Sequence, residues 1–140
     1  MDKSQRPLPL VDPVGAPFWE ALHRGQLLVQ WCKACQRGIH YPRIHCPRCL
    51  GRELEWRESI GRGVLHAFTI VHRHFDPFFQ ARVPYIVGLV ELEEGVRLMS
   101  SLVGIKASPD AVQIGTKLQV EFERVDESFT LHAFRPLATA

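Results

Sequence analysis

The stretch WCKACQRGIHYPRIHCPRCLGRELEW, residues 31–56, holds every cysteine of this 140-residue chain. The cysteines form two Cys-x-x-Cys pairs, Cys32 with Cys35 and Cys46 with Cys49, separated by ten residues. Two such pairs supply the tetrahedral shell of four thiolates that Zn²⁺ prefers. The spacing therefore predicts a zinc ribbon with these four cysteines as the metal ligands.

The expected zinc site is structural, because four thiolates leave no open position for water or substrate. His40 and His45 lie within the same stretch; with four cysteines available, we expect them on the surface or beside the site. A redox role for either pair would need a thioredoxin-like βαβ context, which the pattern does not show. The chain has no membrane-spanning run and no secretory signal at its start, so we expect a cytoplasmic protein with reduced thiols.

The rest of the chain predicts a mostly β protein. A short helix is expected at 17–24, and strands at 27–31 and 54–58 bracket the cysteines. Beyond Gly61, turn-punctuated strands are expected at 63–75, 84–92, 96–104, 116–124 and 129–134. Five such strands, with a strandless connection at 105–115, favour a five-stranded barrel of the OB type. The expected domains are an N-terminal arm and helix (1–26), a zinc ribbon (27–59) and an OB-fold barrel (60–140).

Charge is distributed unevenly along the chain. Between Lys33 and Arg73 lie eight basic and three acidic residues, a net charge of +5. Residues 74–140 carry six basic and nine acidic residues, a net charge of −3. The basic region could attract the phosphate of a nucleic acid or of a phosphorylated cofactor, or it could be an ordinary solvated surface.

Several segments in this order resemble the acyl-CoA-associated family that joins a rubredoxin-like zinc ribbon to a C-terminal OB-fold domain. They are FWEALHRGQLLVQWCKAC, YPRIHCPRC, LEW, GRGVLHAFTIVHR, PYIVGLVELEEGVRLMSSLVG, IGTKLQVEFE and FRP, and the likeness covers roughly residues 16–137. Gln36 and Leu50 depart from the family, which commonly has glycine directly after each second cysteine. These two residues would need a positive φ at that turn.

The resemblance implies a non-catalytic accessory subunit of an acyl-CoA-processing enzyme. Its partner would be a thiolase-like, hydratase or aldolase subunit in a hetero-oligomer. The small protein would bridge subunits and help to form the acyl-CoA site, sharing a CoA thioester with that partner. The cofactor of the chain itself would be one structural Zn²⁺.

Two other functions remain open from the residues alone. Zinc ribbons and OB barrels also bind single-stranded nucleic acid, but such binders present aromatic residues beside a positive groove, whereas the barrel half here is acidic. An independent enzyme could use His66, His72 and His74, which alternate along the expected first barrel strand. No serine–histidine–acid order, paired-carboxylate motif or glycine-rich phosphate loop accompanies them.

The segment HRHFDPFFQARVPY, residues 72–85, is the candidate for contact with a partner or an acyl chain. It connects the first two expected barrel strands and carries Phe75, Phe78 and Phe79. Exposed aromatic clusters commonly mark interaction surfaces. Alternatively, the three rings cover one end of the barrel.

Overall fold

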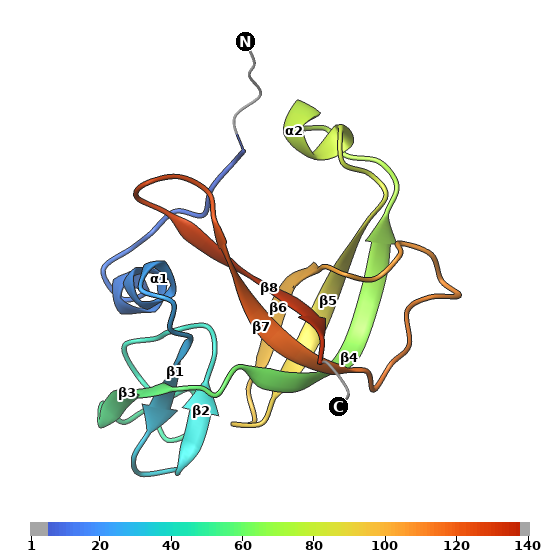
Figure 1. Cartoon of the computed structure of the whole chain (residues 1–140). Helices are drawn as coiled ribbons and strands as arrows, with labels where there is room; N and C mark the ends of the chain where they lie inside the picture. Colours follow the sequence, from blue (N-terminus) through green and yellow to red (C-terminus); the bar gives the residue numbers. More distant parts are fainter. Residues whose placement is uncertain (1–5, 138–140) are drawn as a thin grey trace.

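The computed structural model describes residues 6–137. The first five residues of the expected arm and the last three of the expected barrel domain lie outside the described residues. After the arm comes helix α1 (Ala16–His23). A three-stranded sheet of order β2-β1-β3 follows, built from β1 (Leu28–Cys32), β2 (Arg37–Ile39) and β3 (Leu54–Glu58) (Figure 1).

The C-terminal half is a closed five-stranded barrel of order β4-β5-β6-β8-β7. Its strands are β4 (Arg62–Val71), β5 (Tyr85–Leu92), β6 (Arg97–Leu102), β7 (Lys117–Arg124) and β8 (Thr130–Pro136). Neighbouring strands are antiparallel except β6 and β8, which pair in parallel at Ser101 and Ala133. The predicted mostly β class, with a short helix, a ribbon and a five-stranded OB-type barrel, is confirmed.

Alternation of apolar residues explains the inner face of the barrel. Along β5, Ile86, Val90 and Leu92 are buried while their neighbours are half-buried, and β6 repeats the pattern with buried Leu98 and Leu102. Successive side chains of a strand point to opposite faces, so these residues fill the interior. The strandless connection 105–115 runs between β6 and β7 as expected.

The hydrophobic core is shared between the ribbon half and the barrel. Phe18 and Leu22 of α1 and Val29 of β1 belong to the same buried cluster as Leu65 and Phe134 of the barrel. A second, smaller cluster joins Cys32, Ile39 and Cys46 inside the ribbon. The helix and β1 therefore extend the barrel core, and only the cysteine end of the ribbon has a core of its own.

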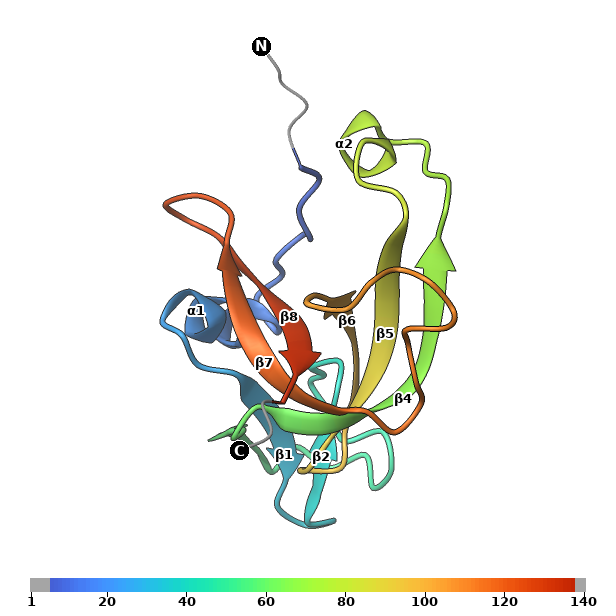
Figure 2. The ribbon, with the colours of Figure 1, turned by 45° about the vertical axis from the view of Figure 1, so that its right-hand side comes forward.

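Gly38 of β2 is the point at which the ribbon touches the turn between β5 and β6. A methyl group built on Gly38 would lie 2.6 Å from Cγ1 of Val96 and 3.2 Å from Cγ1 of Val29. A side chain at this position would therefore overlap the side chain of Val96. The ribbon strand β2 lies beside the β5–β6 turn (Figure 2).

The expected end of the first barrel strand is wrong. The strand expected at 63–75 ends at Val71, which pairs with Tyr85 at the start of β5. The residues that follow lead into a short helix that was not predicted, α2 (Pro77–Gln80). The Asp76 carboxylate caps this helix by accepting a hydrogen bond of 2.8 Å from the Phe78 amide, and Pro77 occupies the first turn.

The arm that precedes α1 passes between α2 and the β7–β8 connection (Figures 1 and 2). Among residues 6–137, no helix combines the length and apolar character needed to cross a membrane.

Candidate functional site

The structure brings together the four cysteines that the sequence predicts as metal ligands. Their sulfur atoms all lie within 4.8 Å of one another. The Sγ atoms of Cys32 and Cys49 are 3.7 Å apart, and those of Cys35 and Cys46 are 3.8 Å apart. A tetrahedral zinc ion with Zn–S bonds of about 2.3 Å requires sulfurs about 3.8 Å apart. These two sulfur pairs therefore have the separation that zinc requires, and the remaining pairs lie within about 1 Å of it.

Backbone amides point at the sulfur atoms. The amide of Cys35 donates to Sγ of Cys32 at 3.4 Å, and the amide of Arg48 donates to Sγ of Cys46 at 3.3 Å. Such bonds stabilise a thiolate. Backbone hydrogen bonds around Cys46, the largest from Cys49, lower the pKa of its thiol to about 6.

The turn after each cysteine pair has the expected left-handed backbone. Gln36 has a φ of 55° and Leu50 a φ of 63°. In each turn the amide of that residue donates to the carbonyl of the first cysteine, from Gln36 to Cys32 and from Leu50 to Cys46, at 2.8 Å. Both turns thus keep their hydrogen-bonded shape without glycine. Gln36 and Leu50 adopt a left-handed backbone conformation that is sterically unfavourable for residues with a side chain.

The two ribbon histidines have different surroundings. His45 is exposed and accepts a hydrogen bond of 2.9 Å from Nε of Arg52. His40 packs against Phe18, with ring centroids 5.4 Å apart, and burial lowers its pKa to about 4. Its Nε2 is buried without a hydrogen-bond partner among the described residues.

The candidate contact residues of the segment 72–85 do not share one surface. Phe75 is fully exposed at 102% of its reference area, whereas Phe78 is buried and Phe79 is half-buried. The guanidinium of Arg82 lies over the Phe78 ring, with its Cζ 3.5 Å from the centroid. Phe78 and Phe79 therefore pack against each other and near Arg82, whereas the Phe75 ring is exposed to solvent.

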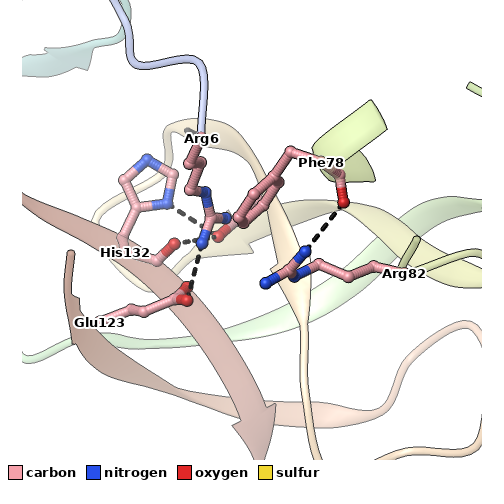
Figure 3. A network of polar contacts seen from close by, with 6 residues as sticks. Arg6, Phe78, Arg82, Glu123 and His132 are labelled. Carbon is pink, nitrogen blue, oxygen red and sulfur yellow. Dashed lines mark hydrogen bonds and ion pairs between the residues drawn. The ribbon is translucent and has the colours of Figure 1, made fainter. Parts of the chain in front are cut away.

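Arg6 also packs against Phe78 and Phe79, and it was not among the residues predicted from the sequence. Its guanidinium lies over Phe78 at 5.3 Å from the ring centroid and donates to Oε2 of Glu123 at 2.7 Å (Figure 3). Its side chain is 17% exposed. No local pattern signals this interaction, because Arg6 and Glu123 are 117 residues apart.

A pocket of about 380 Å³ lies between the arm, α1, the ribbon and the barrel. Arg6, Trp19, His40, Ser100 and His132 contribute to its lining. Oγ of Ser100 and Nδ1 of His132 are 2.7 Å apart, and burial lowers the pKa of His132 to about 4. The imidazoles of His40 and His132 are therefore neutral near pH 7. The sequence does not predict the contact between Ser100 and His132, because the two residues lie on separate strands, β6 and β8.

The histidine row expected on the first barrel strand does not form. His66 lies at a bulge of β4, where the pairing with β5 shifts between Leu65 and Ala67, and His72 and His74 lie beyond the end of the strand. His74 instead accepts a hydrogen bond of 2.9 Å from the amide of Asp76 through Nδ1. Within residues 6–137, the one group of metal-type ligands found together is the cysteine cluster.

Comparison with protein families gives two matches along the chain. Residues 19–55 match the model of the ChsH2 rubredoxin-like zinc ribbon domain. Residues 56–123 match the model of the ChsH2 C-terminal OB-fold domain.

Similar proteins include both larger and smaller chains. A probable enoyl-CoA hydratase alpha subunit of Thermomonospora curvata is 36% identical over 134 residues, and this chain spans 41% of its length. A DUF35 domain-containing scaffold protein of Methanothermobacter thermautotrophicus is 34% identical over 69% of this chain and 71% of its own. The solved structure of the Ltp2-ChsH2(DUF35) aldolase contains a chain that is 35% identical, with a TM-score of 0.81 and coverage of 92% of this chain and 98% of that chain.

Proposed function

The chain belongs to the ChsH2 family of proteins with a rubredoxin-like zinc ribbon and an OB-fold domain, and from this we propose that it is a non-catalytic accessory subunit of an acyl-CoA-processing enzyme. The observation that carries the proposal is the match to the ChsH2(DUF35) chain of an aldolase, which this chain covers almost completely. The relatives named hydratase alpha subunit and scaffold protein support the same role.

The zinc ion of this subunit is held by Cys32, Cys35, Cys46 and Cys49. Zinc supplies a rigid cross-link between the two knuckles, and all four ligand positions are taken by protein sulfur, so the ion has no open position for a substrate. Elemental analysis of reductively purified protein should find one equivalent of zinc. Less than half an equivalent of zinc or iron would contradict the assignment.

The partner is an enzyme subunit of the thiolase-like, hydratase or aldolase type, and the partner carries the catalytic groups. Two features of the described residues support a non-catalytic role. The part-buried Ser100–His132 pair has no carboxylate hydrogen-bonded to its imidazole, and the cysteine cluster uses every cysteine. The two subunits together form the acyl-CoA site.

Phe75 is the contact that we assign to the partner, because its ring is fully exposed beside the packed helix α2. Large aromatic residues at interfaces commonly contribute about 2 kcal/mol or more to binding. Phe75→Ser should therefore weaken complex formation about thirtyfold or more and leave the melting temperature of the isolated chain unchanged.

The test is co-purification of the untagged chain with its partner, followed by mass spectrometry of the intact complex. Ile114→Ser is the matched control. Ile114 is apolar like Phe75 and is 60% exposed, but it lies in the 105–115 connection rather than beside α2. Failure of the wild-type chain to co-purify with any acyl-CoA enzyme would overturn the proposed function. Equal affinity of the wild-type and Phe75→Ser chains would remove Phe75 from the interface.

A further inference from the structure

Aromatic rings form much of the wall of the pocket of about 380 Å³ between the arm, α1, the ribbon and the barrel. Phe18 lies at their centre, with its ring centroid 5.1 Å from that of Trp19 and 5.4 Å from that of His40. The His132 ring is 5.9 Å from Phe18 and lies nearly parallel to Trp19, at an interplanar angle of 16°. Tyr41 adds a fifth ring, 4.2 Å from His40. The pocket therefore offers ring faces and edges from three separate parts of the fold.

This aromatic pocket carries little charge. Burial lowers the pKa of His40 and of His132 to about 4, so both imidazoles are neutral near pH 7. Arg6 is then the one described lining residue whose side chain is charged, and Glu123 already pairs with it at 2.7 Å. A carboxylate or phosphate in the pocket would lose its water without meeting a free positive charge. The pocket thus favours an uncharged molecule.

Two polar atoms of the lining residues are buried without a partner. Within residues 6–137, the buried side-chain nitrogens and oxygens that lack a hydrogen bond are Nε of Arg6, Nε2 of His40 and Nε1 of Trp31, and the first two belong to this pocket. Such unmet groups cost free energy, and they commonly mark a place where a water or a ligand is held. Nε of arginine can only donate, whereas a neutral imidazole nitrogen donates or accepts. A hydroxyl group, which does both, suits the pair.

We propose that this pocket binds a small planar aromatic alcohol, that is, an uncharged aromatic ring system that carries a hydroxyl group. Flat rings stack on aromatic side chains or meet their edges, and such pairs gain more than burial of the same apolar area. The hydroxyl group pairs with the unmet nitrogens of Arg6 and His40. The volume lies within the range of about 300–1,000 Å³ that small-molecule sites occupy. The inference concerns the isolated chain and does not rest on the proposed function.

Equilibrium dialysis of the full zinc-loaded chain with three ligands tests the chemical class. 2-Naphthol, a planar aromatic alcohol that is uncharged at neutral pH, should bind. Decahydro-2-naphthol has the same two-ring outline and hydroxyl group but no aromatic face, and it should bind about tenfold or more weakly. Naphthalene, which lacks the hydroxyl group, should also bind about tenfold more weakly, because the unmet nitrogens then stay unmet.

Three variants, each assayed well below its melting temperature, test the location. Arg6→Gln should weaken 2-naphthol binding about tenfold, because it removes a donor and part of the wall. Met99→Glu should also weaken it, because Met99 lines the pocket and is 55% exposed, which lets a charge enter the rim without a buried cost. Arg57→Gln is the matched control and should bind like the wild type. Arg57 also pairs with a glutamate, Glu55 at 2.6 Å, and lies over an aromatic ring, Trp31 at 4.3 Å, but it does not line the pocket.

Other results would overturn the proposal. If 2-naphthol does not bind measurably to the wild-type chain, the pocket is not a site for this class and a trapped water is left to satisfy the nitrogens. Equal affinity for 2-naphthol and decahydro-2-naphthol would reject the aromatic selectivity. Equal loss of affinity in Arg6→Gln and Arg57→Gln would show nonspecific binding outside the pocket. Because these titrations need no partner, their failure is separate from a failure of co-purification.

Discussion

Replacing Leu50 with glycine should stabilise the folded chain, although it removes a large apolar side chain. Leu50 has a φ of 63°, a conformation in which the Cβ atom crowds the backbone at a cost of about 1–2 kcal/mol. The side chain is 71% exposed, so its removal sacrifices little buried apolar area. The substitution therefore relieves strain at a small packing cost.

The expected gain follows from two opposing effects. Glycine removes the steric cost in the folded state but adds flexibility to the unfolded chain, which costs about 0.4–1 kcal/mol. The net increase in the free energy of unfolding should be about 0.5–1 kcal/mol. For a chain of this size, each kcal/mol of added stability raises the melting temperature by about 2–4 °C.

Denaturant titration with saturating zinc measures the change, and two variants bracket it. Gln36→Gly relieves similar strain but loses the hydrogen bond of 2.6 Å from Nε2 of Gln36 to the carbonyl of Lys33, so its gain should be smaller. Gly25→Ala makes the opposite change at a φ of 80°, with no atom within 4 Å of the new methyl group, and should destabilise. A Leu50→Gly chain less stable than the wild type would refute the reasoning.

Three further predictions follow from the fold. Gly38→Ala should lower the free energy of unfolding by about 1–3 kcal/mol in denaturant titration, because its methyl group overlaps Val96, and Val96→Ala should recover part of the loss. Chelation of zinc should lower the melting temperature of the barrel as well as the ribbon, because the two share a core; a barrel signal that melts unchanged would show them to be independent. Stability should fall as pH falls from about 6.5 toward about 4, because burial lowers the pKa of His132 to about 4 and only the unfolded chain then gains the proton. His132→Asn should reduce this slope by up to about 1.4 kcal/mol per pH unit.

The sequence predicts the parts of this protein that depend on local pattern or on cysteine spacing. The cysteine pairs are enough to place four sulfurs together, because each Cys-x-x-Cys turn closes within a few residues. The expected strand 54–58 coincides with β3, and the boundaries of β1, β5, β6, β7 and β8 shift by one or two residues. The strand expected at 63–75 is longer than β4, and β2 was not expected. The left-handed turns at Gln36 and Leu50 were expected from the resemblance, because the family commonly has glycine at these positions.

Features that depend on distant contacts could not be predicted in this way. The histidines at 72 and 74 continue the alternation of β4, but the strand ends at Val71 because its partner β5 begins only at Tyr85. Asp76 followed by Pro77 is a local pattern typical of a helix start, and it could have predicted α2. The neighbouring phenylalanines were instead interpreted as a contact surface. The contact of Arg6 with Glu123 and the pairing of Ser100 with His132 depend on the closure of the whole barrel.

The packing of α1 against β8 also has a consequence for synthesis of the chain on the ribosome. Phe18 and Leu22 are buried with Phe134, and His23 contacts Thr130 through a hydrogen bond of 2.8 Å. The first helix therefore cannot complete the burial of its apolar face until β8 has been translated and has left the exit tunnel. Until then the nascent chain exposes this face to solvent and to chaperones. Premature termination before β8 should yield a chain that is degraded rather than one that retains a folded N-terminal half.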